Sequence, residues 1–235
     1  WNTGSCAASP ALACLAASWD SEVAGQYGKA LGEEARVREK DVILGPGLNM
    51  YRSPLCGRNF EYMGEDPYLA GKLAVPYIQG LQSNGVAACV KHYACNNEER
   101  HRHKTDVEVS ERALREIYLP AFEMAVKEGD AWSIMASYNL FRGTHCCHNG
   151  YLINDILKGE WGFDGLVMSD WAGTHDTKEA VLGGLDVEFG TKVGKKMPAG
   201  ESVYDIYYLA NPYKEGILSG EYSMEGLDAR VRRVL

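Results

Sequence analysis

GFDGLVMSDWAG, residues 162–173, contains a short apolar run that ends on a single acid. Five residues, Gly165 to Ser169, are predicted to form a buried strand with Leu166–Met168 at its centre, because the run is short, apolar and bounded by glycine. Asp170 follows directly. A carboxylate at the end of a buried strand indicates chemistry at that end, although Asp170 could instead cap a helix that starts near Gly173.

Further apolar segments are also predicted to be buried strands: Val42–Leu44, Val86–Val90, Trp132–Ala136 and, more weakly, Leu185–Phe189. Helical periodicity covers Asp20–Lys40 and a segment from Ser110 to about Glu128, and Asp66-Pro67 is typical of a helix start. The first of these helices should bury one face, made of Val23, Tyr27, Ala30, Leu31 and Ala35. Strands that alternate with helices and are apolar throughout predict a parallel sheet.

Polar residues follow the predicted strands. Lys91 and His92 follow the second, Tyr138 follows the third, and Asp170 and Trp171 follow the fourth. The carboxyl ends of the strands of a (β/α)8 barrel converge on one mouth, whereas a doubly wound sheet concentrates its site at one crevice. We therefore favour an incomplete (β/α)8 barrel with about five strand–helix units in this chain, so three strands lie outside it or are poorly patterned.

The composition is that of an acidic protein with enough apolar residues for a sizeable core. Hydrophobic residues make up 46% of the 235 residues and the net charge is −8, which argues against nucleic acid as a partner. The longest apolar runs, such as Ala7–Ala17, are shorter than the roughly 20 residues that span a bilayer, so no membrane segment is predicted. The chain opens on Trp1 without a charged start and an apolar core, so no signal peptide is predicted either.

The seven cysteines are odd in number and scattered through apolar segments. This pattern favours reduced thiols and a cytoplasmic protein, with a secreted or periplasmic one as the alternative. Two stretches gather possible metal ligands, HRH at 101–103 and HCCH at 145–148. Adjacent cysteines cannot easily chelate one zinc ion, so we expect neither a metal nor another cofactor.

Four sequence blocks carry a family resemblance: GPGLNMYRSPLCGRNFEYMGEDPYLAG, VKHYACNNEERHRHKTDVEVSERALREIYLPAF, MASYNLFRGTHCCHNGYLINDILKGEWGFDGLVMSDW and GLDVE. Together, from about Ala8 to the closing LDARVRRVL, they resemble the catalytic barrel of family 3 glycoside hydrolases, especially the β-glucosidase branch. The resemblance implies a retaining, exo-acting β-glycosidase, first of all a β-glucosidase of short oligosaccharides. Asp170 would then be the nucleophile that forms a covalent glycosyl-aspartate.

The resemblance also implies which residues contact the substrate: Arg58, Lys91, His92, Met135, Tyr138 and Trp171. Arg52 competes with Arg58 for the sugar. Five of these six assignments, all but Tyr138, have a structural alternative: Arg58 in an exposed pair with Glu61 or Glu65, Lys91 paired to a core acid, and His92, Met135 and Trp171 in the core. Adjacent strand residues face opposite ways, so Lys91 and His92 could share one sugar only with a bulge or an unusual peptide there.

A retaining enzyme requires a second carboxyl group as acid and base. By resemblance it comes from an additional α/β domain or chain. Residues 1–235 are therefore expected to be the larger part of the barrel, with the first strands and that domain outside this chain. Glu98 and Glu99 are the first candidates for an acid within it. ACNNEERH does not resemble the loop of the N-acetylglucosaminidase branch. The alternatives are a β-xylosidase or arabinosidase, a non-catalytic sugar-binding barrel and a metal-dependent hydrolase.

Overall fold

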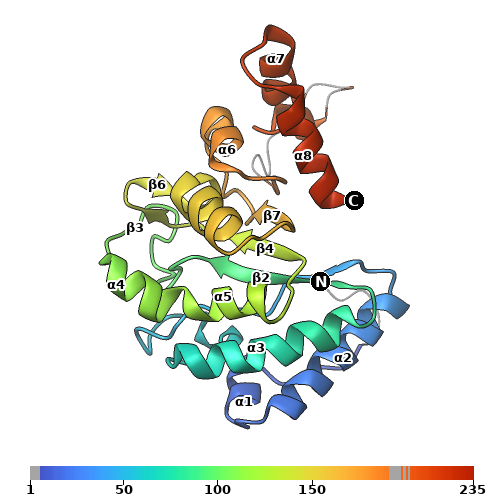
Figure 1. Cartoon of the computed structure of the whole chain (residues 1–235), viewed down its shortest axis with the longest axis vertical. Coiled ribbons are helices and arrows are strands. Elements are labelled where there is room, and N and C mark those ends of the chain that lie inside the picture. The colour runs from blue at the N-terminus through green and yellow to red at the C-terminus, as the bar shows by residue number, and fades with distance from the viewer. Residues whose placement is uncertain (1–5, 191–196, 198–199, 201) are drawn as a thin grey trace. The chain divides into compact units, whose positions relative to one another are not determined.

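The computed structural model describes residues 6–190, 197, 200 and 202–235 (Figure 1). The chain forms two compact units, which are described separately. Unit 1 consists of Trp1–Lys91, Asn97–Glu99 and Val109–Trp132. Unit 2 consists of His92–Asn96, Arg100–Glu108 and Ser133–Leu235.

Unit 1 packs helices beside a short parallel strand pair. Its elements are α1 (Leu12–Ala16), α2 (Ser21–Val37), β1 (Val42–Ile43), η1 (Asn59–Glu61), α3 (Pro67–Gln82), most of β2 (Ala87–Tyr93), α4 (Glu111–Ala113), η2 (Leu114–Tyr118) and α5 (Pro120–Lys127). Val42 pairs with Ala87 and Ile43 with Ala88 in parallel register. Helix α3 runs beside both α2 and α5 (Figure 1).

The buried face of α2 differs from the predicted one. Ala24, Gly28, Gly32 and Ala35 are buried, whereas the predicted Val23 and Ala30 are exposed. A Cβ on Gly28 would overlap the carbonyl oxygen of Tyr77 in α3. The two helices thus meet almost backbone to backbone, and only residues with little or no side chain fit the contact.

The predicted helix starts are confirmed. Asp20 accepts from the backbone N–H of Glu22 at 2.8 Å, and Asp66 accepts from that of Tyr68 at 2.8 Å. The continuous helix predicted from Ser110 to about Glu128 is wrong in one respect, because it is divided into α4, the π-type turn η2 and α5. Pro120 begins α5, and proline has no N–H with which to continue the preceding helical hydrogen bonds.

Unit 2 is built around the parallel pair β4 (Ser133–Ala136) and β7 (Leu166–Ser169), in register from Ser133–Leu166 to Ala136–Ser169. Its helical elements are η3 (Cys146–His148), η4 (Tyr151–Glu160), α6 (Thr177–Gly183), η5 (Val203–Ile206), α7 (Asn211–Ser219) and α8 (Met224–Val234). A small second sheet joins β3 (Asp106–Val107), β5 (Leu140–Phe141) and β6 (Thr144–His145), and its short strands were not predicted.

The four firmer strand predictions are confirmed by β1, β2, β4 and β7, all paired in parallel. The weaker prediction, a strand at Leu185–Phe189, is wrong: the segment forms only an isolated parallel bridge, between Val187 and Met168. This segment exchanges only a few backbone hydrogen bonds with β7, such as that from Ser169 N–H to Val187 O at 2.9 Å. Among the described residues, no helix combines the length and apolar character needed to cross a bilayer.

Candidate active site

Asp170 lies where β7 ends, and the residue before it, Ser169, is held by two hydrogen bonds with the segment Val187–Phe189. The Ser169 N–H donates to Val187 O at 2.9 Å, while the Ser169 hydroxyl accepts from the Phe189 N–H at 2.9 Å. Asp170 itself is only 5% exposed. A carboxylate on so constrained a strand end has little freedom to move, which suits a group that must meet a substrate atom in one geometry.

The Asp170 carboxylate accepts a backbone hydrogen bond and lies beside a buried imidazole. Its Oδ1 accepts from the Trp171 N–H at 2.8 Å, and its Oδ2 lies 3.6 Å from Nε2 of His92. His92 is 1% exposed. The structure therefore brings together, within unit 2, the predicted nucleophile and one of the predicted sugar-binding residues.

The helix-cap alternative for Asp170 is wrong. The next helix, α6, begins at Thr177, and its cap is Asp176, whose side chain accepts from the Glu179 N–H at 2.8 Å. The Asp170 side chain therefore makes its contacts at the end of β7 and does not cap a helix.

Trp171 is not a core residue, contrary to the structural alternative. It is 40% exposed, and its ring stacks on Phe189 with a centroid separation of 5.3 Å and an interplanar angle of 18°. Such a flat, supported aromatic face is suited to the C–H face of a sugar.

Met135 and Tyr138 are both buried in unit 2. Met135 lies in β4 and pairs with Met168 of β7, a position that fits the core alternative. Tyr138 is covered by two residues of the HRH stretch, because the Arg102 guanidinium carbon and the His103 ring both lie 4.3 Å from its ring centroid.

The HCCH stretch forms part of a cluster of three imidazoles. His145 stacks on His175 at 3.9 Å, and His148 lies at 5.6 Å from His145. Burial, followed by the nearby His145 and His175, lowers the pKa of His148 to about 4. All seven cysteines are free thiols, and within the described residues no three His, Cys, Asp or Glu side chains are arranged to hold a metal ion.

Arg58 and Lys91 belong to a half-buried ion cluster in unit 1. Arg58 Nε donates to Oε1 of Glu61, and Lys91 Nζ lies 3.0 Å from Oε2 of the same carboxylate. Arg58 also reaches Glu99 at 3.9 Å, and the Arg58, Glu61 and Glu99 side chains are each 20% exposed. Burial opposes charge here, but the hydrogen bond with Glu61 raises the pKa of Arg58. Burial alone would raise the pKa of Glu61, but the hydrogen bond from Arg58 and the Lys91 charge together lower it.

The alternatives for these two cations are thus partly right. Lys91 does pair with an acid, Glu61, and Arg58 does contact Glu61, but in a half-buried cluster rather than an exposed pair. Arg52, the competing arginine, lies over the ring of Tyr118 at 5.8 Å.

The backbone irregularity expected at Lys91 and His92 lies elsewhere. Strand β2 continues regularly through both residues to Tyr93. The peptide bond between Tyr93 and Ala94 is cis, and Cys95 has a positive φ of 65°. Sequence reasoning missed the joint contact of Glu61 with both cations and the support of Trp171 by Phe189. The three-residue spacing of Arg58 and Glu61 indicates their own contact, but no local spacing indicates the contact of Glu61 with Lys91.

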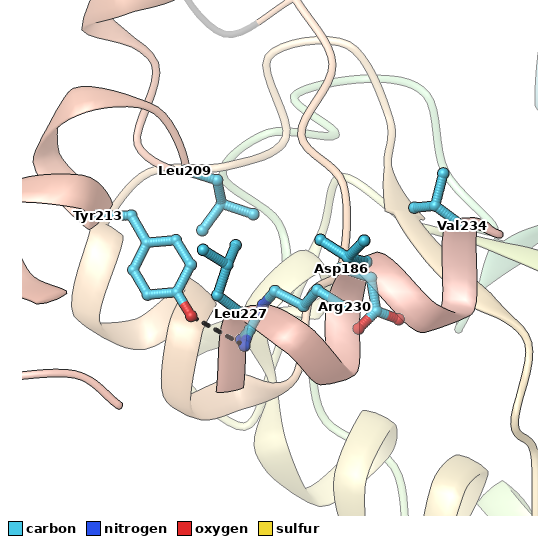
Figure 2. Close-up of a pocket in the computed structure, with 7 residues that line it drawn as sticks. Asp186, Leu209, Tyr213, Leu227, Arg230 and Val234 are labelled. Carbon is cyan, nitrogen blue, oxygen red and sulfur yellow. Dashed lines mark hydrogen bonds between the residues drawn. The ribbon is translucent and has the colours of Figure 1, made fainter. Parts of the chain in front are cut away.

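Figure 2 shows residues that line a cavity in unit 2. The cavity has a volume of about 110 Å³. Its lining is mostly apolar: Leu209, Tyr213, Leu227, Val231 and Val234, with Asp186 and Arg230 as the charged members. The Tyr213 hydroxyl accepts from Arg230 Nη1 at 3.3 Å. None of the predicted site residues lines this cavity, so it is not our candidate for the sugar site.

Comparison with known proteins agrees with the sequence blocks. The family described as Glycosyl hydrolase family 3 N terminal domain matches residues 2–235. Beta-glucosidase BoGH3A of Bacteroides ovatus is 59% identical over the whole chain, which covers 32% of that protein. An exo-alpha-(1->6)-L-arabinopyranosidase of Bifidobacterium longum is 49% identical over 179 residues, 76% of this chain and 24% of that protein.

Solved structures show the same fold. Beta-glucosidase 3B of Thermotoga neapolitana, in complex with glycerol, gives a TM-score of 0.86 at 42% identity, covering 95% of this chain and 31% of that one. DesR, a beta-glucosidase of Streptomyces venezuelae in complex with D-glucose, gives 0.89 at 37% identity, covering 95% and 28%. These matches confirm the predicted fold, an α/β barrel of the (β/α)8 type of which this chain holds a part. The chain spans about a third of the length of BoGH3A, and over residues 2–235 it belongs to glycosyl hydrolase family 3, as part of its N-terminal domain.

Proposed function

We propose that the protein carrying this chain is a retaining, exo-acting β-glycosidase. Its first substrates would be short oligosaccharides with a terminal β-D-glucosyl residue. The observation that carries the proposal is the carboxylate of Asp170, which is buried at the end of β7, held by the Trp171 N–H and 3.6 Å from His92 Nε2. The named beta-glucosidases among the relatives of this chain support glucose as the first sugar to test.

In the proposed reaction, a carboxylate oxygen of Asp170 attacks the anomeric carbon while the bond to the leaving oxygen breaks. This step converts the β-glycoside substrate into an α-linked glycosyl-aspartate. Water then attacks the same carbon from the face opposite Asp170 and gives one proton to the second carboxyl group, which now acts as a base. The bond to Asp170 breaks, so the sugar leaves with its original configuration and the carboxylate is restored. In unit 2, His92, Met135 and Tyr138 are the residues that we expect to contact the glycosyl residue, and Trp171 would cover the next one. In unit 1, Arg58 and Lys91 remain predicted donors to sugar hydroxyls.

The leaving oxygen must take up a proton, and we assign this role to a carboxyl group of an additional domain. Its support is that the chain spans only about a third of BoGH3A. Of the two candidates in the chain, Glu99 already contacts Arg58 at 3.9 Å. The partners we propose are a glycoside or small oligosaccharide as the substrate and the additional α/β domain or chain that supplies the proton-donating carboxyl group. The free thiols of all seven cysteines support a reducing compartment such as the cytoplasm.

The direct test uses the full-length protein with p-nitrophenyl glycosides and cellobiose. We expect the β-glucoside to be cleaved with retention, seen by NMR as initial release of β-glucose. Asp170→Asn should lose at least about 10³-fold in kcat, since no nucleophile remains. Asp164→Asn is the matched control, because it makes the same change at an exposed acid just before β7 and should leave kcat unchanged.

Each alternative has its own result in this experiment. Faster cleavage of an arabinopyranoside or xyloside would replace glucose as the sugar. Loss of activity in a chelator would indicate a metal-dependent hydrolase, and sugar binding without turnover would indicate a non-catalytic barrel. Full activity in Asp170→Asn would refute the nucleophile.

The origin of the acid can be tested by the leaving group. An alkoxide departs poorly without protonation, an effect typically worth 10²–10⁴-fold, whereas dinitrophenolate departs without help. We expect a whole barrel that lacks the additional domain to be glycosylated by dinitrophenyl glucoside but to cleave cellobiose scarcely. Full cellobiose activity of such a barrel would place the acid within it, with Glu98 and Glu99 the first residues to replace.

A further inference from the structure

The carboxylate of Glu61 joins the two cations of unit 1. One of its oxygens accepts from Arg58 Nε, and the other lies 3.0 Å from Lys91 Nζ. Arg58 comes from the loop before η1, Glu61 ends η1, and Lys91 lies in β2. One side chain therefore fixes the relative position of two cationic groups that are 33 residues apart in sequence.

The backbone of unit 1 is built to allow this contact. The segment before η1 runs along β2, since the Lys91 N–H donates to Pro46 O at 3.0 Å and the Leu48 N–H donates to Lys91 O at 2.6 Å. Between them, Gly47 forms a parallel bridge with Lys91. A Cβ on Gly47 would lie 2.6 Å from the carbonyl oxygen of Glu61. The missing side chain at position 47 thus lets Glu61 come close to the strand that carries Lys91.

The Glu61 carboxylate also compensates the positive charges of Arg58 and Lys91. The side chains of Arg58, Glu61 and Lys91 are 16–20% exposed, so water screens their interaction only in part. Without the Glu61 carboxylate, Arg58 would keep the longer contact with Glu99 at 3.9 Å, but Arg58 and Lys91 would repel each other because they would have lost the counter-charge that they share. Each would then turn toward other partners and leave its present position.

We propose that Glu61 is a positioning residue, which holds Arg58 and Lys91 in the geometry needed to bind sugar hydroxyls. This inference rests on the proposed function, which gives those two cations to the sugar. Glu61 itself is not a catalytic residue, because both of its oxygens are directed to the cations. Its loss should act through Lys91 and Arg58, so its effect should shrink when Lys91 is already absent.

The experiment is a double-mutant cycle in the full-length enzyme with p-nitrophenyl β-glucoside. Glu61→Gln, which keeps the shape and removes the charge, should lower kcat/KM by about 10²-fold, a typical loss for misplaced contacts. In the Lys91→Ala background the same substitution should cost less than about tenfold, because the shared interaction is already gone. A role in folding alone would give equal losses in both backgrounds and a lower Tm.

Glu123→Gln is the matched control. Glu123 pairs with Lys127 at 2.6 Å on an exposed face of α5 in the same unit, and its replacement should leave kcat/KM unchanged. Glu61→Asp keeps the charge and should restore part of the lost kcat/KM. If Glu61→Gln does not fold, Glu61→Asp takes its place in the cycle, since the shorter side chain still loosens the contact with Lys91.

The outcomes separate the inference from the proposed function. An inactive parent, or unchanged kcat/KM in Lys91→Ala, would refute the sugar-binding role itself. An active parent that is weakened by Lys91→Ala but not by the Glu61 variants would overturn only the positioning role. Equal losses in the two backgrounds would overturn it as well.

Discussion

Replacement of His148 tests the electrostatics of the imidazole cluster in unit 2. His148 is 3% exposed and lies on η3. The titratable groups facing it are His145 of β6, His175 before α6, and Asp176 and Glu179 at the start of α6. Glu179 Oε2 lies 2.9 Å from its Nδ1, but the Glu179 side chain is 57% exposed, so water screens that charge. Burial and the two imidazoles therefore dominate.

The size of the effect follows from the pKa. The ordinary pKa of histidine is 6.5, and in the folded protein that of His148 is lowered to about 4. Between pH 6.5 and pH 4, His148 binds a proton in the unfolded chain but stays neutral in the folded protein. The contribution of His148 to the free energy of unfolding is therefore complete above pH 6.5 and falls as the pH drops toward 4. Each unit of pKa difference is worth about 1.4 kcal/mol, which makes the loss about 2 kcal/mol at pH 5 and about 3 kcal/mol below pH 4.

The assay is urea unfolding of the full-length protein at pH 7.5 and pH 5, with the parent and His148→Gln. The variant should lose about 2 kcal/mol less than the parent between the two pH values, because glutamine does not titrate. His101→Asn, at an exposed histidine of the same unit, should keep the pH dependence of the parent. The reasoning is refuted if parent and His148→Gln lose the same free energy.

Three further predictions concern packing and substrate contact. Asp186→Asn removes the carboxylate that lies 3.1 Å from Lys158, and breaking this buried pair should cost about 3–5 kcal/mol in urea unfolding; unchanged stability would contradict it. Trp171→Ala should weaken cellobiose binding about tenfold, measured as KM, with little change in kcat, because it removes an exposed aromatic face; an equal KM would contradict this role. Gly28→Ala should destabilise the protein by about 1–3 kcal/mol despite the better helix propensity of alanine, whereas Gly57→Ala, in open space, should not; equal Tm values for the two would show that the α2–α3 contact yields.

The strands could be predicted because their apolar runs are short and continuous, as buried parallel strands require. The buried face of α2 could not, because hydrophobicity gives Gly28 no weight, although its contact with Tyr77 depends on having no side chain. The division of the helix after Ser110 could have been predicted from Pro120, which cannot donate the hydrogen bond that a continuous helix needs.

The candidate site was predictable residue by residue but not as a set of contacts. The pattern that marks Asp170 as an acid at a strand end fits a helix cap equally well, and only the position of α6 decides between them. The proximity of His92 to Asp170 depends on two segments 78 residues apart. The same is true of the contact between Glu61 and Lys91, which local spacing does not encode.

The most direct test of the nucleophile is to trap it. A 2-deoxy-2-fluoroglucoside with a dinitrophenolate leaving group should form a glycosyl-enzyme that hydrolyses slowly, since the fluorine destabilises the oxocarbenium-like transition states and the good leaving group favours the first step. After proteolysis of the full-length protein, mass spectrometry should find the added fluoroglucosyl mass on the peptide that contains Leu166–Ser169 and Asp170, with fragmentation placing it on Asp170. A fluoroglucosyl group on any other carboxylate, or none while the parent enzyme is active and inhibited by the reagent, would contradict the account.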